Sequence, residues 1–368
     1  SLFSTIRGIE VLDVRAAGVT PTLVLTDAMV GGSDTNRLLV LFDDQGLILS
    51  AGGLAAGHDV TLRGEGTVVL ADGVNNRVGL DENQALTLVS GNGDDYLRLR
   101  GGILQVYGGA GDDVFSVSGT GRFTLDGGAG DDVFQMTNPG GVVGHTVRGG
   151  SGFDELRLYE SATLTRADLA NVTGIDRITL YGSTNDLNVA ETMFDGRLEM
   201  EGAGGRRTVH IDISDFDAAD TLVVGENLDV ALSGRAGVSY RIETTSATKG
   251  TVRGSEGNDQ MTGSTAADRL YGMDGMDLLL GGNGDDRLDG GAGADRLTGG
   301  KGFDALTGGA GNDAFVYTHM SEIGDVITDF GAVSGDRDTV DLSALFDANN
   351  LGALDTAGAF AQGVLSLR

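Results

Sequence analysis

The sequence contains no cysteine, no tryptophan and only two prolines. The missing cysteines exclude disulfide bonds, thiolate-bound metals and thiol catalysis. Aromatic residues make up 5% of the chain, so a core must be built mainly from leucine, valine and isoleucine, which suits thin and regular layers. Disordered linkers are usually rich in both glycine and proline, so 63 glycines beside two prolines indicate ordered tight turns instead.

Positive charge is also scarce. The chain has 25 Lys and Arg against 54 Asp and Glu, a formal net charge of −29. This balance disfavours nucleic acid and anionic membrane surfaces as partners and favours multivalent cations. The longest aliphatic runs, such as RLLVLF at 37–42, are too short to cross a bilayer, and the first residues show no signal-peptide pattern. We therefore expect no membrane span.

A nine-residue repeat runs without a gap through residues 254–316. Its seven units read GSEGNDQMT, GSTAADRLY, GMDGMDLLL, GGNGDDRLD, GGAGADRLT, GGKGFDALT and GGAGNDAFV. The sixth place is always aspartate: Asp259, Asp268, Asp277, Asp286, Asp295, Asp304 and Asp313. The eighth place is always a large apolar residue: Met261, Leu270, Leu279, Leu288, Leu297, Leu306 and Phe315. Chance does not place seven aspartates in register, so a flexible linker is excluded.

The repeat predicts a coil of two nonapeptides. Glycines allow positive φ, so the first six places can form a tight turn, and the last three can form a short strand with its middle side chain inward. In an 18-residue coil, sixth-place aspartates of alternate units stack about 4.8 Å apart. Such columns repel unless a cation lies between them, and Ca²⁺ prefers carboxylate and main-chain carbonyl oxygens. The expected stacked pairs are Asp259/Asp277, Asp277/Asp295, Asp295/Asp313, Asp268/Asp286 and Asp286/Asp304.

This pattern resembles the RTX, or hemolysin-type calcium-binding, family of nonapeptide repeats. The resemblance implies a right-handed parallel β-roll that folds on several Ca²⁺ ions and is exported unfolded by type I secretion machinery. One departure is Ala266, which occupies the place of the second turn glycine in GSTAAD, so we expect a weaker site at Asp268.

A sparser block of the same motif lies upstream. SGNGDDYLR (90–98), GGAGDDVFS (108–116), GGAGDDVFQ (127–135) and GGSGFDELR (149–157) follow at steps of 18, 19 and 22 residues. One edge is expected to bind calcium through Asp95, Asp113, Asp132 and Asp154. The longest step leaves room for a loop around NPGGVVGH, so the pairing of Asp132 with Asp154 stays open.

Short alternating strands fill most of the remaining chain and merge into the repeat blocks, which favours a continuous all-β solenoid. TRADLANV (165–172) is the best helix candidate. TIRGIEVLDV (5–14) resembles NVTGIDRITL (171–180), and the two repeat blocks begin at 90 and 254, which indicates two tandem units. We divide the chain into a calcium-poor strand region (1–89), a first RTX block (90–157), a second calcium-poor region (158–253), the seven-repeat roll (254–316) and a C-terminal cap with a secretion-associated segment (317–368).

The cap resembles the end of secreted RTX proteins, where D-x-I-x-D-F and D-x-I-D-L-S motifs follow the last repeat. Here they read Asp325-Val-Ile-Thr-Asp329-Phe and Asp338-Thr-Val-Asp-Leu-Ser. An open solenoid needs such a lid to cover its last apolar layer and its strand edge.

No catalytic constellation stands out. The four histidines lack metal-ligand spacing, and H-E-x-x-H and G-x-S-x-G motifs are absent. Paired carboxylates such as Asp285-Asp286 are better explained as turn residues and ligands than as a glycosidase pair. We therefore expect no enzyme active site in this chain.

Two classes of function remain. The first is a secreted bacterial structural protein, such as an S-layer, adhesive or biofilm component, with calcium as ligand and self-association or cell-surface glycan as further partners. It would be extracellular and associated with the cell surface. The second is the secretion and folding module of a larger enzyme, for example a serralysin-type protease or a lipase. A polysaccharide-active solenoid is a third and weaker alternative, because the hints of a cationic groove are limited to Arg206, Arg207 and Lys249.

Overall fold

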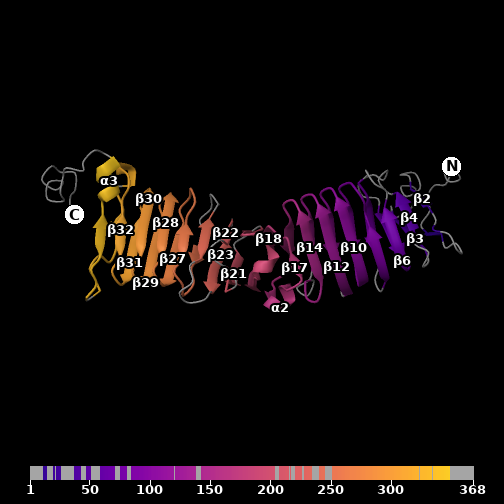
Figure 1. Ribbon diagram of the computed structural model, residues 1–368, viewed down its shortest axis with the longest axis horizontal. Coiled ribbons are helices and arrows are strands. Elements are labelled where there is room, and N and C mark those ends of the chain that lie inside the picture. Colours follow the sequence, from indigo (N-terminus) through magenta and orange to yellow (C-terminus); the bar gives the residue numbers. More distant parts are fainter. Residues whose placement is uncertain are drawn as a thin grey trace. The chain divides into compact units, whose positions relative to one another are not determined.

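The computed structural model describes residues 11–14, 20, 22–25, 37–42, 47–50, 59–70, 75–80, 84–119, 121–137, 142–203, 207–214, 216, 220–225, 228–233, 240–244, 251–322, 324–333 and 335–348. Nearly all regular elements are β-strands, and every strand pairing assigned between them is parallel. The chain divides into two compact units, residues 1–200 and 201–368. Each unit is a β-solenoid in which the chain alternates between two stacks of strands (Figure 1). The expected all-β parallel solenoid is confirmed.

In the first unit, odd-numbered strands form most of one stack and even-numbered strands form the other. The first stack comprises β1 (Val11–Asp13), β3 (Arg37–Leu41), β5 (Asp59–Arg63), β7 (Arg77–Leu80), β9 (Tyr96–Leu99), β11 (Val114–Val117), β13 (Val133–Met136), β15 (Glu155–Leu158) and β18 (Arg177–Leu180). The second comprises β2 (Thr22–Val24), β4 (Leu47–Ser50), β6 (Gly66–Leu70), β8 (Ala85–Val89), β10 (Gly102–Ala110), β12 (Gly121–Ala129), β14 (Thr146–Ser151) and β17 (Val172–Thr173).

The last coils of the first unit are less regular. β16 (Thr163–Leu164) pairs with β19 (Thr184–Asn188), and the 3-10 helix η2 spans Glu191–Met193. The short helix α2 (Arg166–Leu169) lies within the segment 165–172, so the helix prediction is confirmed. Its N-terminus carries a reciprocal capping box between Thr165 and Asp168, which satisfies two helix-end donors.

The second unit repeats the arrangement. One stack comprises β22 (Thr221–Val224), β24 (Arg241–Thr244), β26 (Gln260–Thr262), β28 (Leu278–Asn283), β30 (Arg296–Lys301), β32 (Ala314–Val316) and β34 (Thr339–Asp341). The other comprises β21 (Arg207–Asp212), β23 (Leu228–Ser233), β25 (Thr251–Arg253), β27 (Arg269–Asp274), β29 (Arg287–Ala292), β31 (Ala305–Ala310) and β33 (Val326–Ile327). β20 (Arg197–Gly202) includes the boundary between the two units.

The strands β27 to β31 of the seven-repeat roll have six residues instead of the three predicted, whereas β26 and β32 have three. β29, for example, begins at the seventh place of one nonapeptide and ends at the third place of the next. The glycines at the first two places lie within these strands, and those at the second place pair between coils, as Gly282 does with Gly300. Because glycine lacks a Cβ, the strand can continue through these places where neighbouring coils approach closely. The tight bend is therefore confined to the fourth to sixth places.

Each coil contributes inward-facing apolar side chains to the core. The eighth-place residues of the roll, Met261 to Phe315, are all 0–1% exposed, as the pattern predicts. In the first unit the rings of Phe115 and Phe134 stack at 4.8 Å between centroids. Burying one such side chain contributes about 1.5–3 kcal/mol, and identical layers repeat this gain at every coil.

The predicted cap is present at the end of the roll. β33 pairs with β31, and β34 pairs with β32, so the last two strands of the repeat are covered. Phe330 lies 6.2 Å from Phe315, between ring centroids, against the last eighth-place side chain. The helix α3 (Ser343–Ala348) follows, and the expected secretion-associated tail from residue 349 onward lies outside the described residues. None of the helices in the described ranges is long and apolar enough to cross a membrane.

Candidate metal centre

The sixth-place aspartates of the roll form two buried columns. All seven are 1–2% exposed, although a carboxylate is normally found at the surface. The backbone N–H of each aspartate donates to Oδ1 of the aspartate one coil further on, at 2.7–2.9 Å. These bonds join the five pairs that the 18-residue coil predicts, from Asp259/Asp277 to Asp295/Asp313. The second carboxylate oxygen is then left for another ligand.

That second oxygen is buried and has no partner in most of the columns. Oδ2 of Asp277, Asp286, Asp295, Asp304 and Asp313 is shielded from solvent without a hydrogen bond. The same holds for Oδ2 of Asp95, Asp113, Asp132 and Asp154 in the first unit. A buried, unsatisfied carboxylate oxygen carries a large desolvation cost, so a repeated set of them indicates cation-binding sites.

In the roll, a first-place glycine lies beside each orphaned oxygen. A Cβ added to Gly272 would lie 2.2 Å from Oδ2 of Asp277 and 2.5 Å from the carbonyl oxygen of Gly290. The same two kinds of oxygen converge at Gly254, Gly263, Gly281 and Gly290, where such a Cβ would lie 2.0–3.1 Å from both. Only glycine leaves this space open, which explains its presence at the first place of all seven units.

Carboxylate and carbonyl oxygens are the donors that Ca²⁺ selects, with 6–8 oxygens at about 2.3–2.6 Å. Within the described part of the chain no three Asp, Glu, His or Cys side chains form one metal-binding group. A site here must therefore combine the paired carboxylates with backbone carbonyls, and such an all-oxygen set suits calcium and not zinc. The residues present fit the ion that the sequence predicts.

The carboxylates in these columns titrate abnormally without a cation. Burial raises the pKa of Asp113 from 3.8 to about 8 and that of Asp277 and Asp286 to about 7, and neighbouring carboxylates add to the rise. Burial also raises the pKa of Asp132 to about 7 and that of Asp154 and Asp295 to about 6. Each column therefore favours either a proton or a bound cation over a bare negative charge.

The first two aspartates of the roll differ from the rest. Oδ2 of Asp259 accepts the N–H of Ser255 at 2.7 Å, and Oδ2 of Asp268 accepts the N–H of Ser264 at 2.6 Å and its hydroxyl at 2.8 Å. Serine stands at the second place only in these two units. The sequence analysis expected a weaker site at Asp268 because of Ala266. In the structure the residue bonded to this carboxylate is Ser264, so the reason to expect weaker calcium binding at Asp268 is Ser264 and not Ala266.

The upstream block forms one continuous column of the same kind. The N–H of Asp95 donates to Asp113 at 2.8 Å, and that of Asp113 donates to Asp132 at 2.8 Å. The N–H of Asp132 donates to Asp154 at 2.9 Å, so the pair that the sequence left open is also stacked. The longer step of 22 residues therefore does not break the column.

Two carboxylates of the cap extend the columns of the roll, which the sequence analysis missed. Asp325 accepts the N–H of Asp304 at 3.0 Å, and Asp338 accepts the N–H of Asp313 at 3.2 Å. Oδ2 of Asp325 is buried without a partner, and burial raises the pKa of Asp325 to about 7. The signal was available, because both residues open the two cap motifs that were interpreted only as a lid.

The fifth place carries a separate ladder. The N–H of Asp112 donates to Oδ1 of Asp94, and the N–H of Asp131 donates to Oδ1 of Asp112, at 3.0 and 2.8 Å. These side chains are exposed and accept an N–H of the following coil, whereas the sixth-place side chains accept an N–H of the preceding coil. The frequent Asp or Asn at the fifth place is therefore explained by hydrogen bonding between coils.

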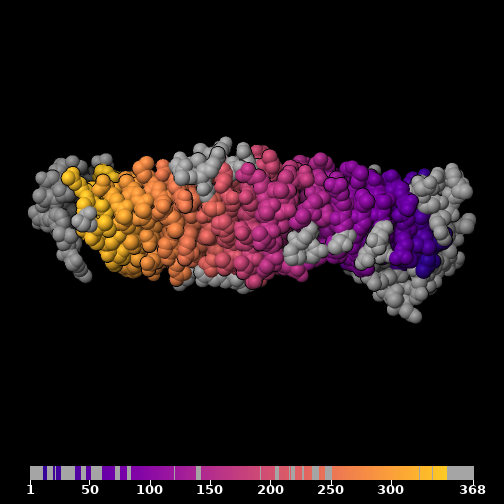
Figure 2. Space-filling view, turned by 90° about the horizontal axis from the view of Figure 1, so that it is seen from below, coloured from indigo at the N-terminus to yellow at the C-terminus, as the bar shows by residue number. Residues whose placement is uncertain are grey.

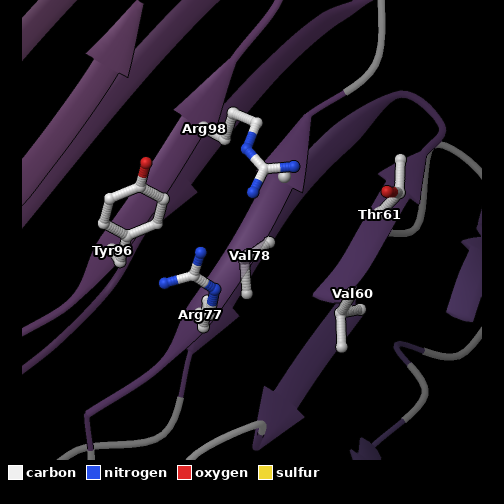
Figure 3. A pocket seen from close by; sticks show the side chains of 7 residues that line it. Val60, Thr61, Arg77, Val78, Tyr96 and Arg98 are labelled. Atoms are coloured by element: carbon white, nitrogen blue, oxygen red, sulfur yellow. The ribbon is translucent and has the colours of Figure 1, made fainter. Parts of the chain in front are cut away.

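The outer surfaces of the described residues carry several open depressions, two of them in the second unit, beside Gly254 and Met273 and beside Asp229 and Arg253. One in the first unit lies over Gly79, between Thr61, Arg98 and Arg77, whose guanidinium lies 4.3 Å from the ring centroid of Tyr96 (Figure 3). No acid–base pair lines this depression. Over the orange coils of the second unit, the face in Figure 2 is filled by closely packed side chains. The columns remain the main concentration of chemically unusual groups among the described residues.

Comparisons with known proteins agree with this geometry. The family described as RTX calcium-binding nonapeptide repeat matches residues 253–288 and 289–316, with four copies. No catalytic family is identified, and no curated protein and no solved structure matches the chain. RTX repeats bind several Ca²⁺ ions and indicate a protein exported by type I secretion. Residues 253–316 are therefore RTX calcium-binding nonapeptide repeats, folded as a parallel β-roll.

Proposed function

We propose that the protein is an extracellular structural component of a bacterial cell surface, such as an S-layer, adhesive or biofilm protein. The observation that supports it most is the presence of stacked aspartate columns through the coils of both compact units, from Asp95 to Asp154 and from Asp259 to Asp338. Here the metal sites are part of the fold, and the solenoid itself is the working element.

Calcium would act as a folding signal for the compartment. In a cytosol with little calcium, carboxylates of adjacent coils repel and oppose stacking of the short strands. Sites of the extracellular type have a Kd of about 10⁻⁴–10⁻³ M and fill only outside the cell. Stacked aspartates such as Asp277 and Asp295 belong to neighbouring coils, so filling one site favours the next and folding becomes cooperative.

The test is a calcium titration of the purified chain from excess EGTA to millimolar calcium. Far-UV circular dichroism and size-exclusion chromatography with light scattering would be recorded on the same samples, with magnesium as the control for ionic strength. We expect a cooperative gain of β signal together with compaction, and oligomers at the same calcium concentration. A chain that folds with calcium but stays monomeric at all concentrations, and that is absent from the cell envelope on fractionation, contradicts the surface role.

The second candidate is the secretion and folding module of a larger enzyme. The observation in its favour is the cap, where Asp329 accepts the N–H groups of Gly308 and Gly309 and so closes the last turn of the roll. A proteolytic or lipolytic domain found on the native secreted protein would decide for this candidate. For the polysaccharide-active alternative, Arg206 and Lys249 lie outside the described residues.

A further inference from the structure

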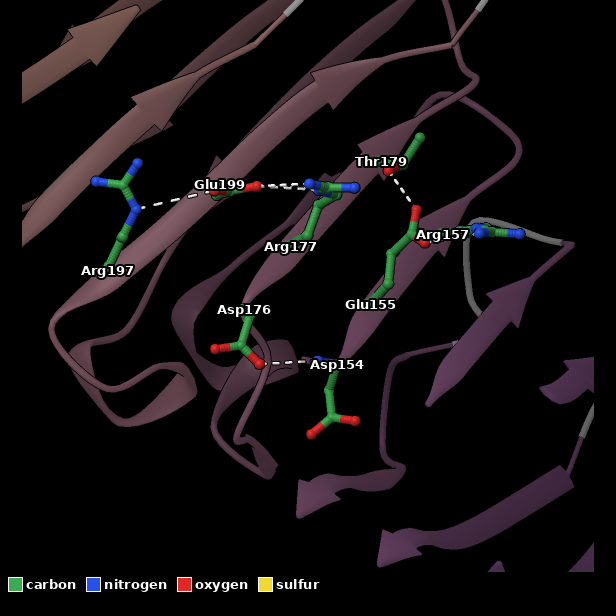
Figure 4. A network of polar contacts seen from close by, with 8 residues as sticks. All are labelled: Asp154, Glu155, Arg157, Asp176, Arg177, Thr179, Arg197 and Glu199. Carbon is green, nitrogen blue, oxygen red and sulfur yellow. Dashed lines mark hydrogen bonds and ion pairs between the residues drawn. The ribbon is translucent and has the colours of Figure 1, made fainter. Parts of the chain in front are cut away.

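The column of the first unit does not end with its last nonapeptide. The N–H of Asp154 donates to Oδ2 of Asp176 at 2.8 Å (Figure 4). In the same way, the N–H of Asp132 donates to Asp154 at 2.9 Å. Asp176 belongs to TGIDRITL, a segment without the repeat pattern. The strand register agrees. Glu155 pairs with Arg177, so the aspartates just before them, Asp154 and Asp176, lie one coil apart in the same column.

A glycine of the same segment supplies the second half of the pattern. A Cβ added to Gly149 would lie 1.8 Å from the carbonyl oxygen of Gly174 and 2.4 Å from Oδ2 of Asp154. At Gly127, inside the repeat block, the corresponding distances are 2.5 Å to the carbonyl oxygen of Gly149 and 2.1 Å to Oδ2 of Asp132. The space beside Asp154 is thus bounded by the same oxygens as the space beside Asp132.

Residues 174–176 reach this geometry by a shorter path. In a nonapeptide the first-place glycine and the sixth-place aspartate are five residues apart, as in Gly149 and Asp154, whereas Gly174 and Asp176 are two apart. Gly174 has φ +65°, which permits the sharp turn, and Ile175 between them is fully buried. The side chain of Asp154 is 1% exposed, and its Oδ2 points into this space without a partner.

We propose that the segment Gly174–Ile175–Asp176 completes a further divalent-cation site with Asp154, using the carbonyl oxygen of Gly174 and the carboxylate of Asp176. The segment terminates the column, because the residue at the next position of the ladder is the apolar Leu198. A three-residue G-I-D turn therefore performs the ligand role of a complete nonapeptide. The proposal rests on calcium binding by the repeats, and it assigns ligands in a region that the sequence places among calcium-poor strands.

The test uses Asp176→Asn in the full chain, with Glu160→Gln as the matched control. Asparagine can keep the hydrogen bond from the N–H of Asp154 while removing one charge, so the variant retains the fold. Glu160→Gln removes the same charge from an exposed side chain nearby. Hydrogen–deuterium exchange of peptides covering 170–182 would be followed as calcium is added, with peptides from 254–316 as the internal reference.

We expect Asp176→Asn to move the calcium midpoint for protection of 170–182 upward by about tenfold or more, and bound calcium to fall by one ion per chain. The midpoint of 254–316 and all midpoints of Glu160→Gln should stay at the wild-type values. If 170–182 keeps its wild-type midpoint in Asp176→Asn while 254–316 responds to calcium, the G-I-D site is wrong and the repeats are unaffected. If no peptide of the wild type responds to calcium, the proposed function itself fails.

Discussion

Replacing Asp286 with asparagine should have opposite effects on stability without and with calcium. Asp286 lies between Asp268 and Asp304 in its column, and its Oδ1 accepts the N–H of Asp268 at 2.8 Å. Its Oδ2 is buried without a partner, next to the carbonyl oxygen of Gly299 around Gly281. An asparagine keeps the size and the accepting oxygen, and its amide nitrogen places a donor near that carbonyl.

The size of the effect without calcium follows from the pKa. Burial, reinforced by Asp304 and Asp268, raises the pKa of Asp286 from 3.8 to about 7. One pKa unit corresponds to about 1.4 kcal/mol, so at pH 7.5 the buried charge costs about 4 kcal/mol relative to the unfolded chain. Since a domain is stable by only about 5–15 kcal/mol, two or three such sites are enough to unfold the calcium-free roll. Removing the charge should recover several kcal/mol.

With calcium the same substitution removes a ligand that serves two stacked pairs. We expect the calcium midpoint to rise by about tenfold or more and the melting temperature in millimolar calcium to fall. Asp268→Asn is the matched control. Its carboxylate has one column neighbour within the repeats and is already bonded to Ser264, so both effects should be smaller.

The assay is thermal unfolding followed by circular dichroism at pH 7.5, in EGTA and in millimolar calcium. Trimethylamine N-oxide can be added to every sample if the wild type lacks a folded baseline in EGTA, because this osmolyte favours compact states. Asp286→Asn should melt above wild type in EGTA and below it in calcium. A shift of the same sign in both buffers, or effects of Asp268→Asn as large as those of Asp286→Asn, would refute the shared-ligand column.

Three further predictions follow from the same structure. First, the raised carboxylate pKa values mean that the folded calcium-free state binds more protons than the unfolded chain. In EGTA the β signal should therefore be present near pH 4–5 and lost as the pH rises through about 7, and the calcium midpoints should rise as the pH falls. A β signal that grows with pH in EGTA contradicts this. Second, Gly290→Ala places a Cβ 2.4 Å from Oδ2 of Asp295 and 2.6 Å from the carbonyl oxygen of Gly308, so it should abolish calcium-induced folding of the roll. Gly79→Ala, whose Cβ has its neighbours at 3.6 Å or more, should leave folding in calcium unchanged in the same titration. Third, Leu288→Ala truncates a fully buried side chain and should lower stability in calcium by about 2–5 kcal/mol in urea denaturation, without changing the number of bound ions measured by equilibrium dialysis.

The regular part of the fold could be predicted because its physics is periodic. An aspartate and a leucine at fixed places, such as Asp286 and Leu288, define which side chain binds and which is buried, and the coil length then defines the stacked pairs. The strand segments before each block, such as RVGL and VHIDI, follow from alternation, and the structure places β7 and β21 there. The strand ends were predicted less well, since glycines at the first two places were assigned to the turn although they belong to the strands and the second-place glycines pair between coils.

The residues that were missed stand where the period stops. Asp325 and Asp338 continue the columns from the positions just before the two cap strands β33 and β34. Asp176 continues the column of the first unit from a turn whose glycine-to-aspartate spacing is two residues instead of five. A search for a nine-residue register does not find these residues. Asp325 and Asp338 could have been found from the two cap motifs that they open, whereas only the three-dimensional stacking aligns Asp176 with the repeats. Likewise Ser255 and Ser264 differ from glycine in sequence by one small hydroxyl-bearing side chain, yet they give Asp259 and Asp268 hydrogen-bond partners in place of orphaned oxygens.

These exceptions share one physical cause. In a column of like charges, the carboxylate oxygens at the two ends have the fewest neighbours with which to share a cation. An interior carboxylate such as Asp295 has a neighbour on either side and can share a cation with each. A terminal carboxylate has only one such neighbour, so its remaining oxygen needs another solution. At the start of the roll that solution is the serine turn at Asp259 and Asp268, and at its end it is the cap carboxylates. Protein donors bond the starting carboxylates, whereas the interior carboxylates are left to calcium. The first turns of the roll would therefore form at a lower calcium concentration and serve as the template on which the remaining coils stack.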